Sequence, residues 1–399
     1  MSLLELLALP QVWEEFYEYK LSRSVPKEDS REIREFIDGG GFRLAAASVL
    51  AGEAFPLPRR SVISKMSTGK KRVVYTYPRE QNLVLKLLTF LLLRQYDGLF
   101  SEGLWSFRPG RTAKGAVLRL LHLTRGRELW AYKADIHDYF NSIPVSRLLP
   151  ELEAVTGGDP ELFAFLRSLL TEERVISGGR IIREEQKGIM AGTPLSAFYA
   201  NLYLRSLDEA FQAVPYGRYS DDIIVFAPTR QAALEQAASI RGRLSERGLE
   251  LNPDKEALFS PEEGWTFLGF AVRGDTVDIA PATVKKLKAK MRRKARSLVR
   301  WAKRSGAEGQ RAARAFVRIF NRKLLEGPGE NELTWSRWFF PVITTSDTLH
   351  EIDLYCQDCL RYIASGTRKK SRFNVRYEDL KALGCRSLVN EYYRINADK

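Results

Sequence analysis

The chain has 399 residues, of which 63 are Lys or Arg and 49 are Asp or Glu, so its formal net charge is +14. At about 150 residues per domain this length predicts two to three domains, and a hydrophobic content of 44% is sufficient for a large core. The basic excess indicates a polyanionic partner, because clustered Lys and Arg gain from counterion release on phosphates. Three cysteines exclude a disulfide framework, and no apolar run approaches the roughly 20 residues that span a bilayer. We therefore expect a soluble cytoplasmic protein with no membrane partner.

The N-terminal 55 residues have apolar positions three and four apart, which predicts helices. Residues 56–78 are typical of a basic hairpin with its turn at 67–70, and a helix follows over 79–94. In the middle third we expect strands over 129–136, 218–228 (two strands flanking 220–222), 249–259, 265–272 and 276–279, and helices over 160–170, 194–211 and 229–247. This order favours an α+β sheet with helices on one face over a doubly wound fold. After residue 281 the pattern is helical and strongly basic, with a Gly-Pro-Gly break at 327–329.

Three aspartates in two segments carry most of the chemical information. Asp135 ends an apolar strand, and Asp221 and Asp222 form a turn in front of the apolar run 223–226. Two adjacent aspartates are more often simple turn residues, but here both segments adjoin apolar strands. Hard divalent cations such as Mg²⁺ take carboxylate oxygens as ligands, and two such ions can activate a 3′-hydroxyl and stabilise a leaving pyrophosphate.

Several motifs resemble those of reverse transcriptases, and they occur in the family's order between about residues 56 and 272. They are FS (100–101) with SFRPGR (106–111), DIHDYFNSIP (135–144), GIMAGTPLSA (188–197) with ANLYL (200–204), YSDD (219–222), LELNPDK (249–255) and FLGF (267–270). The block at 100–111 is similar to that of bacterial, group II intron-related enzymes. The resemblance implies a right-hand polymerase fold, with N-terminal helices and fingers over 1–110, a catalytic palm of antiparallel sheet and helices over 111–280, and a helical thumb and C-terminal region over 281–399.

The resemblance also implies the roles of individual site residues. Asp135 and Asp221 would bind two Mg²⁺ ions (or Mn²⁺) with the backbone carbonyl of Ile136, and Asp222 would be a close auxiliary carboxylate. Lys255 matches a position that protonates the leaving pyrophosphate, although a solvated lysine at a strand end is the alternative. The residues implied for nucleotide binding are Arg72 (with Lys65, Lys70 and Lys71 as neighbouring candidates), Phe140 as the gate against a ribose 2′-hydroxyl, Ala191 and Gly192.

One departure concerns the nucleotide site. Most family members have Gln where this chain has Ala191, and Met190 replaces the usual Pro. That Gln normally helps to seat the incoming nucleotide. The change leaves polymerase chemistry possible but brings ordinary substrate handling, processivity and fidelity into question.

Further residues are expected to contact nucleic acid. Phe267, Leu268 and Gly269 correspond to the primer-grip turn, and Arg108 and Arg111 are candidates for the template backbone. The segment 285–304 holds eleven basic residues and no acidic one, which favours a nucleic-acid contact through Lys288, Arg292, Arg293, Lys294 and Arg296. Cys356 and Cys359 lack the further ligands that a zinc site needs, so we expect them to be structural.

The sequence thus predicts an RNA-directed DNA polymerase that uses dNTPs to make a DNA product on an RNA template. The C-terminal region resembles that of domesticated, defence-associated bacterial enzymes, which implies a dedicated structured non-coding RNA and a role in antiphage defence. Two alternatives stay open: a group II intron-type maturase that lacks an endonuclease, and a non-catalytic RNA-binding protein on a polymerase scaffold.

Overall fold

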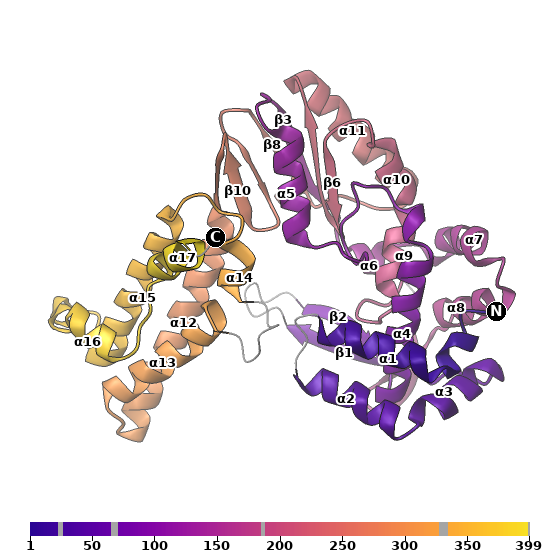
Figure 1. The fold of residues 1–399 in the computed structure, drawn as a ribbon, viewed down its shortest axis with the longest axis horizontal. Coiled ribbons are helices and arrows are strands. Elements are labelled where there is room, and N and C mark those ends of the chain that lie inside the picture. The colour runs from indigo at the N-terminus through magenta and orange to yellow at the C-terminus, as the bar shows by residue number, and fades with distance from the viewer. Residues whose placement is uncertain (23–26, 65–70, 185–187, 327–333, 398–399) are drawn as a thin grey trace. The chain divides into compact units, whose positions relative to one another are not determined.

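The computed structural model of the chain describes residues 1–22, 27–64, 71–184, 188–326 and 334–397 (Figure 1). The chain divides into two compact units, Met1–Pro261 and Glu262–Lys399. The predicted turn at 67–70 and the predicted break at 327–329 lie outside the described residues. Among those described, no helix is long and apolar enough to cross a membrane.

The first unit begins with helices and a hairpin. The helical segments are η1 (Glu5–Ala8), α1 (Pro10–Leu21), α2 (Lys27–Asp38) and α3 (Gly41–Leu50), and the hairpin consists of β1 (Arg59–Ser64) and β2 (Lys71–Thr76). The helix α4 (Arg79–Gln95) follows and is buried at nearly every position from Leu83 to Leu93. A helix that is apolar all round belongs in a core. The longest apolar run of the sequence is therefore the central helix of this unit.

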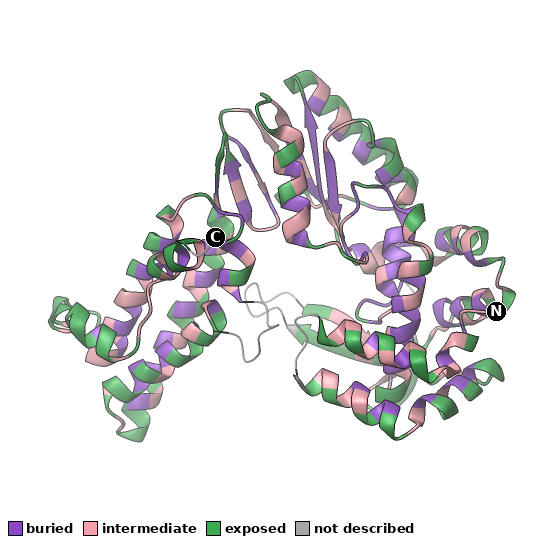
Figure 2. Cartoon of the chain, in the orientation of Figure 1, coloured by how far each residue is buried: buried purple, intermediate pink, exposed green. Residues whose placement is uncertain are grey.

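The sheet that carries the predicted aspartates has the strand order β6-β7-β3-β8. These strands are β3 (Trp130–Asp135), β6 (Tyr216–Tyr219), β7 (Asp222–Ala227) and β8 (Ala257–Phe259). The helices α5 (Ala113–Thr124) and α11 (Arg230–Glu246) pack against it, α5 on β6 and α11 on β3 and β7. Residues 223–226 are all fully buried (Figure 2). Because successive strand residues point to opposite faces, β7 is covered on both of its faces. The sequence pattern predicts cover on one face of the sheet only.

The rest of the first unit links the hairpin to this sheet. It comprises η2 (Asp97–Leu99), α6 (Tyr139–Ser142), α7 (Val145–Thr156), α8 (Pro160–Leu170), β4 (Arg174–Ser177), β5 (Arg180–Arg183), α9 (Ser196–Tyr203), α10 (Arg205–Ala210) and η3 (Pro253–Lys255). The predicted helix 194–211 is thus broken at Leu204 into two. The β4–β5 hairpin extends the β1–β2 hairpin into a second sheet of order β2-β1-β4-β5. One continuous hydrophobic core extends from Leu4 to Leu249, so the regions predicted as fingers and palm fold together.

The second unit combines a small sheet with helices. The sheet is β9 (Trp265–Phe267), β10 (Phe270–Arg273) and β11 (Thr276–Ile279). The helices are α12 (Pro281–Ser305), α13 (Gly309–Leu324), α14 (Trp335–Phe339), α15 (Asp347–Ser365), α16 (Tyr377–Ala382) and α17 (Leu388–Ala397), with η4 (Lys370–Asn374) after α15. Helices α12, α13 and α15 pack on one another. The predicted boundary at 280/281 falls inside this unit, because the small sheet groups with the helices.

Candidate active site

The structure brings the two predicted aspartate segments together in one sheet. Strands β3 and β7 are antiparallel neighbours, and their register places Asp135 directly opposite Asp222. Asp221 lies in the turn between β6 and β7, next to Ser220, whose φ of 59° is left-handed. The side chain of Asp135 is only 6% exposed. All three carboxylates therefore lie at one end of the sheet, on residues that the backbone pairing holds in place.

Backbone hydrogen bonds fix this end of the sheet further. The Ile136 amide donates to the carbonyl of Asp221 at 3.0 Å, and the Asn252 amide donates to the carbonyl of Asp135 at 2.7 Å. Among the described residues, no backbone amide donates to the carbonyl of Ile136. An oxygen of the type that hard cations bind is thus left available beside the carboxylates.

Lys255 contacts the site directly. Its Nζ donates to Oδ2 of Asp135 at 2.6 Å, while its own side chain is 53% exposed. The motif at 249–255 is thereby joined to the first aspartate through a charged pair. A cation bound at Asp135 would compete with this ammonium for the same carboxylate oxygen.

The electrostatics of the turn favour a cation. Burial raises the pKa of Asp221, and the neighbouring Asp135 raises it further. Burial also raises the pKa of Asp222 to about 6, although Lys133 acts against this shift. The potential metal ligands are hard oxygen atoms. The raised pKa values show that the charged form of both carboxylates is unfavourable in the absence of a cation. The residues therefore fit a divalent metal held by two carboxylates and a carbonyl. Within the described residues, no three His, Cys, Asp or Glu side chains gather closely enough to enclose a metal by themselves.

A buried ion pair behind the turn was not found from the sequence. Arg218 and Asp208 both have fully buried side chains and meet at 2.6 and 2.7 Å. Arg218 also donates to the carbonyl of Ser220 at 3.1 Å, and the Tyr216 hydroxyl donates to Asp208 at 2.8 Å. Burial acts to lower the pKa of Arg218, but Asp208 more than offsets this effect and the pKa is raised. Arg218 therefore stays charged, and its contacts tie the aspartate turn to α10. The only sequence signal for the pair is an Arg immediately before the YSDD motif.

The predicted nucleotide-binding residues lie on two segments that contact each other. Arg72 and Lys71 are exposed on β2, whereas Lys65 and Lys70 lie outside the described residues. The Tyr75 amide of the same strand donates to the carbonyl of Ala191 at 2.9 Å. Gly192 has a φ of 104°, and a Cβ there would lie 3.0 Å from the Tyr75 carbonyl oxygen. The backbone of the 188–195 loop therefore packs closely against the hairpin strand that carries Arg72.

Phe140 lies in α6, five residues after Asp135, and is half-buried. Its ring packs against Tyr139 with centroids 5.6 Å apart, and its carbonyl accepts from the Ile189 amide at 2.9 Å. A hollow of about 570 Å³ borders α6 and the hairpin, but four carboxylates line it: Asp138, Glu172, Glu173 and Glu184. Four carboxylates make that hollow unsuited to a triphosphate, so we do not assign the nucleotide to it.

Two predicted template contacts are already engaged within the protein. The Arg108 side chain is only 4% exposed and forms an ion pair with Asp97 at 2.7 Å. It also donates to the carbonyls of Ser101, Leu104 and Asp97. These bonds use the guanidinium donors of Arg108 to close a loop. Arg108 therefore has a structural role in place of the predicted contact with the template. Arg111 pairs with Glu102 at 2.6 Å and lies over the Trp105 ring.

The remaining candidates lie in the second unit. Phe267 is buried at the end of β9, and Leu268 and Gly269 both have positive φ, so 267–270 forms the expected tight turn. On α12, Arg292, Arg293 and Arg296 are exposed and Lys294 is half-buried, while Lys288 forms an ion pair with Glu351. Cys356 and Cys359 are free thiols on α15.

An antiparallel sheet with paired aspartates at one end, joined to a hairpin-bearing helical region and followed by a helical unit, defines a polymerase of the right-hand class. Residues 63–272, just over half of the chain, match the family described as reverse transcriptase (RNA-dependent DNA polymerase). The chain therefore belongs to the reverse transcriptase family.

Individual proteins show more distant similarity. The chain is 30% identical over 155 residues to an uncharacterised 91 kDa protein in cob intron from Schizosaccharomyces pombe. That match covers 38% of this chain and 18% of the relative, so the chain spans only a small part of the relative's length. Among solved structures, apo telomerase from Candida tropicalis, truncated from its C-terminal domain, aligns with a TM-score of 0.47 and 12% identity over 57% of this chain and 55% of that one. Telomerase from Candida albicans in complex with a telomeric RNA fragment aligns with a TM-score of 0.46 and 12% identity over 89% and 71% of the two chains.

Proposed function

We propose that this protein is an RNA-directed DNA polymerase, which adds dNTPs to a primer on an RNA template. The observation that carries the proposal is the pairing of Asp135 with Asp222 across β3 and β7, with Asp221 in the adjoining turn. Membership of the reverse transcriptase family supports it. The intact carboxylates argue against a non-catalytic scaffold, since burying them without a chemical role would only cost stability.

The chain's own residues have distinct tasks in this reaction. Asp135, Asp221 and the carbonyl of Ile136 would hold Mg²⁺. Two bound ions would lower the pKa of the primer 3′-hydroxyl and stabilise the leaving pyrophosphate. Lys255, whose Nζ lies 2.6 Å from Oδ2 of Asp135, would donate a proton to the departing pyrophosphate. Asp222 contributes negative charge behind the ligands.

Residues on other segments of the chain would orient the substrate. Arg72 presents a planar, multidentate donor suited to a triphosphate, and the Ala191–Gly192 backbone supports its strand. Phe140 excludes a 2′-hydroxyl with a ring that is half-buried and therefore still accessible on one side. In the second unit, the 267–269 turn would contact the primer, and Arg293, Lys294 and Arg296 of α12 would contact the paired strands.

The test is template and sugar selectivity. The purified chain should extend a labelled primer on an RNA template with Mg²⁺ and dNTPs, and extension with rNTPs should be at least about a hundredfold slower, since a steric gate acts on the difference between two substrates. A DNA template of the same sequence serves as the comparison. If neither template supports extension with any nucleotide, the proposal fails.

For the physiological setting we propose a structured non-coding RNA as template and a role in antiphage defence, which the C-terminal resemblance to defence-associated enzymes supports. The competing setting is intron splicing, and the partial similarity to a protein in cob intron favours it. Sequencing the RNA that copurifies with the chain separates them. A single non-intronic RNA supports the first setting, and intron RNA supports the second.

A further inference from the structure

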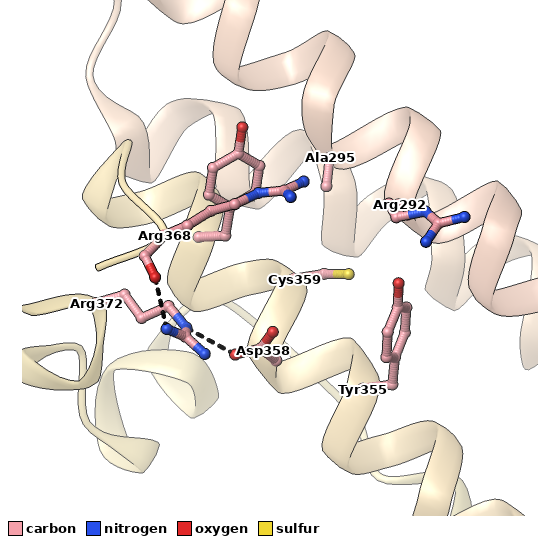
Figure 3. Close-up of a pocket in the computed structure, with 8 residues that line it drawn as sticks. Arg292, Ala295, Tyr355, Asp358, Cys359, Arg368 and Arg372 are labelled. Carbon is pink, nitrogen blue, oxygen red and sulfur yellow. Dashed lines mark hydrogen bonds and ion pairs between the residues drawn. The ribbon is translucent and has the colours of Figure 1, made fainter. Parts of the chain in front are cut away.

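A continuous groove runs between α12 and α15 in the second unit. It consists of two hollows, of about 280 Å³ and about 480 Å³, which share Arg292 and Tyr355. Figure 3 shows the smaller hollow, with Arg292 and Ala295 on one helix and Tyr355, Asp358 and Cys359 on the other. Because the two hollows meet at the same side chains, they form one track along the helix pair.

The charge of this groove is strongly positive. The basic side chains that line it are Lys285, Lys288, Arg292, Arg368 and Arg372, and the acidic ones are Glu351 and Asp358. Each acid already has a basic partner: Lys288 pairs with Glu351, and Arg372 with Asp358. Among the described residues, Lys285, Arg292 and Arg368 have no carboxylate partner. Three cations thus remain to receive an anion from outside the chain.

The floor of the groove is aromatic. Tyr355 and Tyr362 are seven residues apart on α15, so they lie on one helix face, and both are half-buried. The Arg368 guanidinium lies 4.8 Å from the Tyr362 ring centre, and the Lys288 ammonium lies 5.1 Å from that of Tyr355. Cys359 lies between the two tyrosines; burial raises the pKa of its thiol to about 12. It therefore stays neutral and adds neither a charge nor a metal ligand.

Alternating aromatic faces and unpaired cations are the recognition chemistry of single-stranded nucleic acid, in which bases stack on rings and phosphates meet basic groups. A duplex keeps the faces of its bases stacked inside and exposes only base edges and backbone, so its bases cannot stack on tyrosine rings. We propose that the α12–α15 groove binds an unpaired segment of a nucleic-acid strand, with bases on Tyr355 and Tyr362 and phosphates on Lys285, Arg292 and Arg368. The inference rests on the proposed function for the class of its partner, and it adds a second contact that the catalytic unit does not contain.

Two further arginines of α12, the helix that carries Arg292, provide a matched control. Arg300 and Arg304 are exposed and line neither hollow. Replacing both of them removes two guanidinium groups, as many as replacing Arg292 and Arg368 removes. The pair of double variants R292A/R368A and R300A/R304A therefore separates binding in the groove from general attraction to a basic surface. All four side chains are exposed, so neither double variant removes a side chain from the core.

The experiment measures the anisotropy of a fluorescent single-stranded RNA of about ten nucleotides, a length within the usual range of such sites, with the full chain and without Mg²⁺ or dNTPs. A DNA strand and a duplex of the same sequence form the other two arms. For the RNA strand, R292A/R368A should raise Kd about tenfold or more, and R300A/R304A no more than about threefold. For the duplex, the two double variants should differ by less than about twofold.

Aromatic stacking has its own test. Y362L should weaken single-strand binding about tenfold, and Y362F should restore it, because each stacked base contributes through the ring and not through the hydroxyl. Equal losses in the two double variants, equal effects on single strand and duplex, or no binding of the single strand by the wild type would each overturn the inference. Primer extension on a short primed template is scored separately. A chain that binds the strand through the groove but extends no primer contradicts the proposed function alone.

Discussion

The carboxylate of Asp222 lies where burial opposes its charge. Its pKa is raised from 3.8 to about 6, first by burial and then, against the effect of Lys133, by Asp221 and Asp135. A buried acid of this kind lowers stability whenever it is ionised. The aspartate turn therefore lowers the stability of the fold at the position where we propose that a cation binds.

This conflict predicts that D222N stabilises the protein in the absence of metal. With EDTA at pH 8, the free energy of unfolding should rise by about 1–3 kcal/mol, since a shift of one pKa unit corresponds to about 1.4 kcal/mol. Because the folded-state pKa is above the unfolded value, the gain is present above about pH 6 and should disappear as the pH falls toward 4. Urea denaturation at the two pH values measures it. A destabilised D222N at pH 8 would contradict this view of the turn.

Phe140 gives a second prediction for a single residue. If its ring blocks the ribose 2′-hydroxyl, F140A should raise kcat/KM for rNTPs much more than it lowers kcat/KM for dNTPs, by at least about tenfold in the ratio. The adjacent Tyr139 is buried, with its hydroxyl bonded to the Ala200 carbonyl, so Y139A serves as the control for a core aromatic. It should reduce stability and both activities together. An rNTP/dNTP ratio unchanged in F140A would exclude the gate.

At the scale of elements, the Arg218–Asp208 pair joins β6 to α10 behind the aspartate turn. Both side chains are fully buried, so removing one partner leaves an isolated charge. R218M and D208N should each lower the free energy of unfolding by about 3–5 kcal/mol, whereas R218M/D208L should recover most of that loss. The exposed pair Arg174–Glu172 is the control, and R174M should cost less than about 1 kcal/mol.

Because the double variant should remain folded, its activity also tests whether the Arg218–Asp208 pair positions the aspartate turn in addition to stabilising the fold. Without Arg218 the Ser220 carbonyl loses its 3.1 Å donor, so R218M/D208L should remain folded but extend primers with a reduced kcat and an almost unchanged KM. Steady-state kinetics on a primed RNA template measures this. Full activity in the stable double variant would show that the pair serves folding alone.

The elements that could be predicted from the sequence are those whose signal is local. The helix α8 begins at Pro160 after the capping residue Asp159, whose side chain accepts from the Leu162 amide, and the predicted bounds agree with the observed ones. The paired aspartates could be predicted because an apolar strand adjoins each segment. Strand β5, in contrast, is exposed at all four positions and has no alternation to reveal it; its place depends on pairing with β4.

Side-chain partners that are distant in sequence could not be predicted. Arg108 lies in a block typical of nucleic-acid contacts, but the structure uses it to bind loop carbonyls and Asp97. A sequence does not indicate which backbone carbonyls a side chain will contact. A buried arginine therefore cannot be distinguished from a solvent-exposed one by sequence alone. The same holds for Arg292, whose place in a groove depends on the packing of α15 against α12.

At the scale of the whole molecule, the net charge of +14 predicts RNA binding that weakens steeply with salt. Neutralising Arg292, Arg293, Lys294 and Arg296 together should weaken the complex and lower the slope of log K against log salt by up to about 3.6, because each lost phosphate contact contributes about 0.7–0.9. Titrations of the full chain at several salt concentrations measure both. An unchanged affinity and slope would show that RNA lies elsewhere, along the first unit.

The most direct test of the central claim is single-nucleotide primer extension by three proteins: the wild type, D221N, and D254N as a control that removes an exposed carboxylate next to Lys255. With an RNA template, Mg²⁺ and one dNTP, the wild type and D254N should add the nucleotide at similar rates. D221N should be at least about a thousandfold slower, with its fold intact by circular dichroism, because loss of a metal-binding charge affects the rate far more than the stability. Extension by D221N at the wild-type rate would contradict the assignment of the active site.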